Sequence, residues 1–147
     1  MISIRRMNAQ DMPAARFLLS QLGYVLGSEE IRRRYDKVTS SQDHALMVGK
    51  RGGALVALCH VFARPALDKP PEAVVQALVV DQACRGEGVG RIMMAAAESW
   101  ARDRGFMSVA LASDIGRSAA HTFYKRLGYQ RIASSTLFRK DLNGEAK

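Results

Sequence analysis

The sequence predicts an α/β or α+β fold, in which helices pack on a mixed, partly antiparallel sheet. Residues 44–50 and 53–64 alternate as two strands joined by a Gly-containing turn, which is the pattern of an antiparallel hairpin. Residues 72–80 and 107–112, EAVVQALVV and MSVALA, are apolar segments on either side of a helix-length stretch. A strand–helix–strand unit of this length places its two strands parallel, because such crossovers are right-handed.

The residues before the hairpin predict one strand and two helices. Residues 2–7 alternate well enough for a first strand. Asp11 and Pro13 then open a helix, because aspartate can cap the free amides and proline fits the first turn. Gly23 ends this helix, and a second, strongly basic helix is expected over residues 28–38.

The residues from 72 onward predict the more informative half of the fold. Residues 72–80 are apolar on both faces, as in a central strand that is covered from both sides. Apolar residues at helical spacing predict a helix over residues 89–104 and a shorter one over residues 117–127. Residues 129–133 and 135–142 are expected to close the chain as an antiparallel pair.

The composition predicts one domain over residues 1–147 that takes an anionic ligand. The chain carries 22 Lys and Arg against 14 Asp and Glu, a net charge of +8, which favours an anionic partner. The basic residues are scattered, however, which also fits the solvated surface of a basic protein. Aromatic residues interleaved with basic ones, the usual pattern for single-stranded nucleic acid, are missing. Nucleic acid is therefore not the expected partner.

The sequence gives no reason to expect a membrane partner. No apolar run approaches the roughly 18 residues that span a bilayer, and the first residues lack the apolar core of a signal peptide. Cys59 and Cys84 are expected to be free thiols rather than a bridge. We therefore expect a cytoplasmic protein.

A glycine-rich basic loop, CRGEGVGR, joins the strand at residues 72–80 to the helix that follows. In open α/β sheets, ligands bind at such carboxyl ends of strands. The first amides of a helix have no partner inside the helix, and phosphate oxygens satisfy them. The loop is either a plain tight turn or an anion site; it matches neither the Walker loop nor the dinucleotide fingerprint.

Two motifs in this half resemble the GNAT acetyltransferase superfamily. The acetyl-CoA signature of that family, [Q/R]-x-x-G-x-[G/A], matches Arg85, Gly88 and Gly90. Its second signature resembles RSAAHTFYKRLGYQRI, residues 117–132, about 35 residues further on. The correspondence runs without interruption from residue 72 to residue 132.

The resemblance implies a particular architecture. We expect a mixed, mostly antiparallel sheet of six to seven strands, with a V-shaped splay between the fourth and fifth strands and about four flanking helices. Residues 1–71 would shape the acceptor site, residues 72–132 would bind acetyl-CoA, and residues 135–142 would form a C-terminal strand.

The resemblance also implies where the cofactor binds. The pantetheine arm of acetyl-CoA would lie in the splay, bonded to backbone groups near Leu78, Val79 and Val80. The diphosphate would rest on the amides of the loop, which comprises Arg85, Gly86, Glu87, Gly88, Val89, Gly90 and Arg91. The glycine loop would then be a diphosphate site.

Acetyl transfer to an amine needs a neutral amine and a proton for the departing thiolate. Tyr124 falls on the tyrosine that donates this proton in the family, and its alternative role is packing against the pantetheine. Glu72 is the nearest acidic residue for a base, although it lies at the start of its strand. Relay of the proton through water to solvent is the alternative.

Two residues of the second signature segment are candidates for contacts with the coenzyme. Arg117 would touch the phosphates or simply carry surface charge at the start of its helix, and His121 lies one turn before Tyr124. His44 and His60 show no ligand spacing, so we expect no metal.

The resemblance implies an N-acetyltransferase that moves an acetyl group from acetyl-CoA to a primary amine by direct attack in a ternary complex. The acceptor is a small molecule or a protein amine, and a homodimer is compatible with the family. The alternative function is a non-catalytic CoA-binding regulatory module.

Overall fold

The hairpin predicted at residues 44–64 forms the middle of the sheet in the computed structural model, which describes residues 1–114 and 116–144. The chain groups into two compact units, residues 1–112 and 113–147. The prediction of one domain, with its division at residues 71 and 132, stays a prediction.

The first unit contains a five-stranded sheet in the order β1-β2-β3-β4-β5. All neighbouring strands are antiparallel except β4 and β5, which are parallel. The mixed, mostly antiparallel sheet is therefore confirmed. The strands are β1 (Ile2–Arg6), β2 (His44–Arg51), β3 (Ala54–Arg64), β4 (Glu72–Val80) and β5 (Val109–Leu111).

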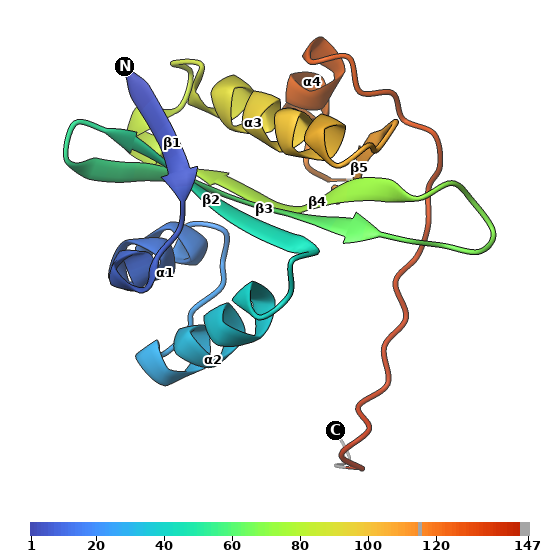
Figure 1. Ribbon diagram of the computed structural model, residues 1–147, viewed down its shortest axis with the longest axis horizontal. Coiled ribbons are helices and arrows are strands. Elements are labelled where there is room, and N and C mark those ends of the chain that lie inside the picture. The colour runs from blue at the N-terminus through green and yellow to red at the C-terminus, as the bar shows by residue number, and fades with distance from the viewer. Residues whose placement is uncertain (115, 145–147) are drawn as a thin grey trace. The chain divides into compact units, whose positions relative to one another are not determined.

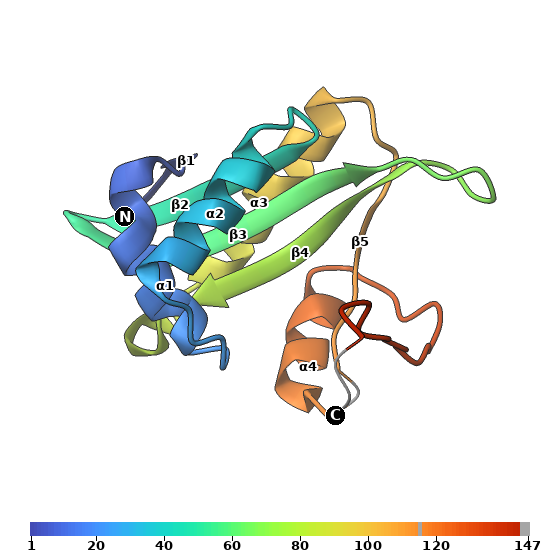
Figure 2. The same cartoon turned by 90° about the horizontal axis from the view of Figure 1, so that it is seen from below.

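Helices cover both faces of this sheet. Figure 1 shows α1 (Met12–Ser20) and α2 (Ser28–Thr39) on one face and α3 (Val89–Asp103) on the other. Figure 2, from below, shows α1 and α2 lying across β2 and β3. None of the helices in the described residues has the length and hydropathy needed to cross a lipid bilayer.

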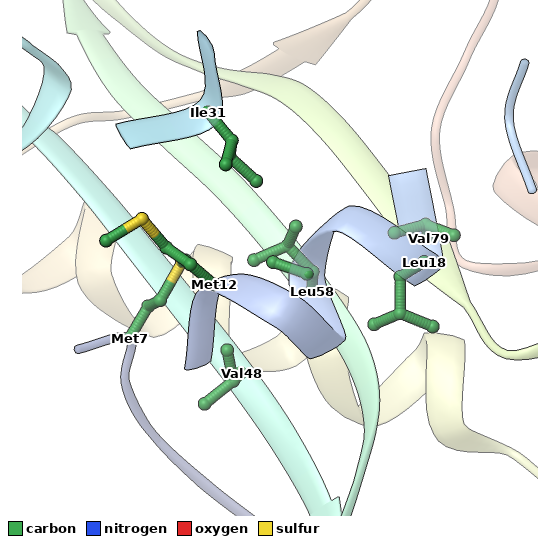
Figure 3. Close-up of a cluster of buried hydrophobic side chains, with 8 residues drawn as sticks. Met7, Met12, Leu18, Ile31, Val48, Leu58 and Val79 are labelled. Carbon is green, nitrogen blue, oxygen red and sulfur yellow. The ribbon is translucent and has the colours of Figure 1, made fainter. Parts of the chain in front are cut away.

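A buried apolar cluster joins α1 and α2 to the sheet. Leu18 is fully buried and Ile31 is 5% exposed, and both pack with Val48 of β2, Leu58 of β3 and Val79 of β4. Figure 3 shows these side chains pointing toward one another from the helices and the strands. The cluster fixes α1 over the end of β4, where the loop to α3 begins.

Gly49 lets α3 approach closely on the opposite face. A Cβ atom at Gly49 would lie 2.8 Å from Sδ of Met93, which is fully buried in α3. A larger residue at position 49 would therefore require the Met93 side chain to shift. The close contact between Gly49 and Met93 packs α3 against the sheet, and the first residues of α3 belong to the glycine loop.

The second unit contains α4 (Ser118–Arg126), which ends in a glycine cap. Gly128 has a φ of +96°. The amide of Tyr129 donates to the carbonyl of Tyr124 at 3.0 Å, and the amide of Gly128 donates to the carbonyl of Lys125 at 3.0 Å. This is the Schellman arrangement, which needs a left-handed residue after the helix. The fourth predicted helix is confirmed.

The expected C-terminal strands are not present in the structure. Residues 129–144 contain no strand, so the described sheet has five strands rather than six to seven. The apolar side chains of this segment are exposed; they are Ile132, Leu137, Phe138 and Leu142. Alternating residues favour a strand, but a strand forms only where a neighbouring strand accepts its hydrogen bonds.

Two histidines lie together on adjacent strands of the first unit. Nδ1 of His44 in β2 lies 2.9 Å from Nε2 of His60 in β3, and Phe62 stacks on His44. Burial, with a smaller effect of the neighbouring His44, lowers the pKa of His60 to about 4 from 6.5. In the described residues no three metal-ligating side chains come together.

The low pKa of His60 predicts lower stability in mild acid. The unfolded chain binds a proton at His60 near pH 6.5, whereas the folded chain binds it only near pH 4. The free energy of unfolding should therefore fall as the pH drops through this window. Because the group is partly solvated, we expect a loss of about 1–2 kcal/mol.

Urea unfolding between pH 7.5 and 5 measures this effect. Asp11, whose pKa the guanidinium of Arg5 lowers, stays ionised in this range in the folded protein. The His60→Gln variant should show a flatter pH profile than the wild type. If the free energy of unfolding of that variant falls equally steeply with pH, groups other than His60 cause the loss of stability in acid.

Candidate active site

The loop between β4 and α3 is shaped by two glycines in left-handed conformations. After β4 the chain makes a short 3-10 turn, Gln82–Cys84, which the Asp81 side chain caps through the amide of Ala83. Gly86 and Gly88 then have φ values of +80° and +85°. Residues with a Cβ rarely adopt these angles. The backbone path of the loop therefore requires glycine at position 88 of the signature, and also at position 86.

The amides of this loop are free to bind a ligand. The first amide of α3 with a backbone acceptor is that of Ile92, which donates to the carbonyl of Gly88 at 3.2 Å. No side chain caps the helix, and its first turn has no acidic residue. Throughout the described part of the chain, no oxygen accepts from the amides of residues 86–91. Such amides, with the helix dipole behind them, bind phosphate oxygens.

The edge of β4 is open where it leads into the loop. β5 pairs only with residues 73–75 of β4, through Val109, Ala110 and Leu111. The remainder of β4, residues 76–80, has no partner on the β5 side within the described residues. The pairing between the fourth and fifth strands therefore ends at Val75 and Leu111, as the expected splay requires.

The register of β3 and β4 shows which backbone groups face the open edge. The amide of Asp81 donates to the carbonyl of Val56 in β3 at 2.8 Å, and Val80 and Val79 lie opposite Ala57 and Leu58. In an antiparallel pair the direction of these bonds alternates along the strand. Val79 therefore bonds toward β3, whereas Leu78 and Val80 direct their amide groups to the open edge.

An extended ligand arm fits this edge. The amide groups of Leu78 and Val80 are spaced as those of a strand, so a chain bearing its own amides can pair with them as an added strand would. The carbonyl of Val80 also accepts a bond from Nε of Arg85 at 3.4 Å. Of the three residues expected beside the pantetheine, Leu78 and Val80 have suitable backbone directions, and Val79 contributes to the core.

Glu72 lies at the opposite end of β4 from the loop, and both of its carboxylate oxygens have partners. Its Oε1 accepts from Nη2 of Arg64 at 2.7 Å, and its Oε2 accepts from the hydroxyl of Ser108 at 3.0 Å. The side chain is 20% exposed. These contacts link β4 to β3 and to the residue before β5.

Tyr124, His121 and Arg117 belong to α4 of the second unit. Tyr124 is half-buried and lies edge-on to Phe123 at 5.0 Å and to Tyr129 at 6.0 Å between ring centroids. His121 lies one turn before Tyr124, on the same side of the helix. Arg117 is the exposed N-cap residue. The glycine loop between β4 and α3 belongs to the first unit.

Two residues outside both signatures hold the loop, and sequence reasoning missed them. Gln21, at the end of α1, accepts from the amide of Gln82 at 2.9 Å and donates to Asp81 at 3.3 Å. Arg51, at the end of β2, forms an ion pair with Glu87 at 2.6 Å. These contacts join residues far apart in sequence, so no local pattern could have shown them.

Comparison with known proteins identifies the family. The model of the acetyltransferase (GNAT) family matches residues 9–129. An uncharacterised N-acetyltransferase of Bacillus subtilis, YhdJ, is 28% identical over 142 residues, which cover 95% of this chain and 99% of the relative.

Two solved structures share the fold. An aminoglycoside N-acetyltransferase, AAC(6′)-Iy, in complex with CoA has a TM-score of 0.87 at 18% identity and covers 95% of each chain. Glucosamine-6-phosphate N-acetyltransferase from Arabidopsis thaliana has a TM-score of 0.81 at 23% identity and covers 96% of this chain and 99% of that one. With the signature loop, the open strand edge and the family match together, the chain belongs to the GNAT family and is an acetyl-CoA-dependent N-acetyltransferase.

Proposed function

We propose that this protein transfers the acetyl group of acetyl-CoA to a primary amine by direct attack within a ternary complex. The observation that carries the proposal is the row of amides at residues 86–91, which have no acceptor in the described chain and follow the open edge of β4 in the sequence. The diphosphate binds the amides, and the pantetheine pairs with Leu78 and Val80. The thioester then lies along the open edge.

The reaction forms a C–N bond and breaks the C–S bond of the thioester. The acceptor ammonium loses a proton before it attacks, and the thiolate of CoA gains one as it leaves. Tyr124 is proposed to supply that proton from its hydroxyl. Arg117 and His121 are proposed to contact the phosphates of the coenzyme, because an exposed cation at a helix start suits an anionic ligand.

The acceptor proton is proposed to leave through water rather than through Glu72. A base must be able to approach the amine, but the carboxylate of Glu72 is already bonded to Arg64 and Ser108. Glu72 also lies before the closed segment of β4, residues 73–75, and the open edge begins after it. The structure therefore supports a structural role for this carboxylate.

The Glu72→Gln variant separates these two roles. Glutamine keeps the shape but removes the charge, so we expect a free energy of unfolding lower by about 1 kcal/mol. Turnover should stay within about twofold of the wild type. A loss of turnover of about 100-fold or more, with the fold intact, would instead make Glu72 the base.

The acceptor is proposed to carry an acidic group beside its amine. Arg16 and Arg32 line a groove of about 380 Å³ between α1 and α2. Glu30, in the first turn of α2, forms ion pairs with Arg33 and Arg34. Together with the net charge of +8, this favours an anionic amine over a polycation.

Release of the CoA thiol from acetyl-CoA in the presence of a panel of amines tests the proposed function. The panel contains glucosamine 6-phosphate, an acidic amino acid, a polyamine, an aminoglycoside and a peptide with a free N-terminus. We expect thiol release that depends on the amine, with a mass increase of one acetyl group on that amine. The anionic amines should react faster than the polycations.

The same measurement separates the enzyme from a non-catalytic CoA-binding module. A module of that kind binds CoA, and CoA raises its melting temperature because a ligand of the native state stabilises it. It releases no thiol above the rate of acetyl-CoA hydrolysis with any amine. Binding of CoA without release of its thiol would therefore contradict the proposed reaction, but it would still support the proposed CoA-binding site.

A further inference from the structure

Glu87 is an unexpected residue in a loop that binds a diphosphate. It is the single acidic residue in CRGEGVGR, residues 84–91, and it lies two residues before the first residue of α3. Carboxylates are attracted to helix N-termini for the same reason as phosphates. A free Glu87 side chain can therefore bind the amides itself, and it repels a diphosphate bound beside it.

Arg51 holds this carboxylate. Its Nη1 lies 2.6 Å from Oε1 of Glu87 and 3.6 Å from Sγ of Cys84. Arg51 thus reaches the loop on both sides of Arg85 and Gly86, from the end of β2. Cys84 is buried, whereas the side chains of Arg51 and Glu87 are 39% and 47% exposed.

The carboxylate of Glu87 makes this ion pair instead of capping α3. No side-chain hydrogen bond caps the helix at Gly88, although Glu87 is the neighbouring residue. Its Oε1 lies beside a cation that comes from the end of β2. The amides at the start of α3 are left open as a consequence.

We propose that Arg51 is a positioning residue of the cofactor site, which keeps Glu87 away from the loop amides and cancels its charge so that the diphosphate of CoA can bind. This inference rests on the proposed function, because it assigns the diphosphate to the loop. An exposed ion pair of this kind adds little to folding stability. Its effect is on the affinity for an anion.

The size of the effect follows from the charges. Without Arg51, a carboxylate on the loop repels a diphosphate within several ångströms, and partial solvent exposure weakens this repulsion. We expect CoA to bind about five- to tenfold more weakly to Arg51→Met than to the wild type. Methionine keeps an apolar stem of similar reach and removes the charge.

Calorimetric titration with CoA, at constant low salt, tests the proposal on four proteins: the wild type, Arg51→Met, Glu87→Gln and the double variant. Glu87→Gln should bind within about twofold of the wild type, because the neutral amide neither competes for the loop nor repels the ligand. The double variant should also bind within about twofold of Glu87→Gln. The loss caused by Arg51→Met is thus rescued by the second change.

Two further variants serve as controls. Arg51→Lys keeps the charge and should bind CoA within about twofold of the wild type. Arg104→Met removes a cation from the ion pair with Asp43 at the other end of α3, about 22 Å away along a helix of this length. It should bind CoA normally. Circular dichroism confirms that each variant is folded.

The outcomes are distinguishable. If Arg51→Met binds CoA as well as the wild type, or if Glu87→Gln fails to rescue it, the proposal is wrong; the second result would mean that Arg51 contacts the phosphates directly. If the wild type itself binds no CoA, the proposed function fails and this inference fails with it. Loss in Arg51→Met with rescue in the double variant supports the proposal.

Discussion

Replacing Tyr124 by phenylalanine is expected to lower the turnover number about 100-fold without changing the affinity for CoA. The change removes one hydroxyl and leaves the ring, whose edge contacts with Phe123 and Tyr129 depend on its shape. Without that hydroxyl the CoA thiolate has to take its proton from water. Steady-state rates with the best amine of the panel, together with calorimetric CoA binding, measure both quantities.

Tyr129→Phe is the matched control for this prediction. Tyr129 follows the glycine cap of α4 and lies edge-on to Tyr124, so the same atom is removed close by. This variant should keep its turnover number within about twofold. An unchanged turnover number in Tyr124→Phe would leave Tyr124 a packing role and remove it from the chemistry.

Replacing Gly88 by alanine is expected to weaken CoA binding at least tenfold. Gly88 has a φ of +85°, and a Cβ there would meet nothing within 4 Å in the protein. An alanine in this conformation costs about 1–2 kcal/mol. The loop then relaxes toward negative φ and turns the amides at the start of α3 away from a common ligand.

Gly105→Ala provides the matched control. Gly105 follows the other end of α3 with the same φ of +85°, and a Cβ there also meets nothing within 4 Å. Both variants should lose a similar free energy of unfolding, measured in urea, and only Gly88→Ala should lose CoA affinity. Equal affinity in the two variants would contradict a role for the Gly88 backbone in binding.

Much of the fold could be predicted from the sequence, because local signals were present. The Gly-containing turn after Arg51 marked the hairpin, and residues 72–80 read as a buried strand. Glycines marked the ends of the helices, as Gly105 and Gly128 do by their left-handed caps. The structure contains each predicted helix and the first five strands within a few residues.

The C-terminal segment shows why the rest could not be predicted. The segment around Leu137 and Phe138 is of a type that favours strands. A strand also needs a neighbouring strand to pair with, and no local pattern in the sequence shows whether one lies within hydrogen-bonding distance. The same limit applies to the histidines, since His44 and His60 are 16 residues apart and meet only through the β2–β3 register.

The candidate site divides in the same way. The signature residues Arg85, Gly88 and Gly90 could be recognised from their type and spacing, and the backbone path of the loop depends on the left-handed Gly88. The contacts that hold this loop, from Gln21 and Arg51, come from distant elements and leave no signal in the loop itself. The hydrogen bonds of the Glu72 carboxylate to Arg64 and Ser108 could likewise be seen only in the structure.

A crystal structure of the protein with CoA tests the central claim most directly. We predict diphosphate oxygens about 2.7–3.2 Å from the amide nitrogens of residues 86–91. We also predict the pantetheine paired with Leu78 and Val80 along the edge that β5 leaves open. A diphosphate bound elsewhere, or a β5 that pairs with β4 as far as Val80, would contradict the account.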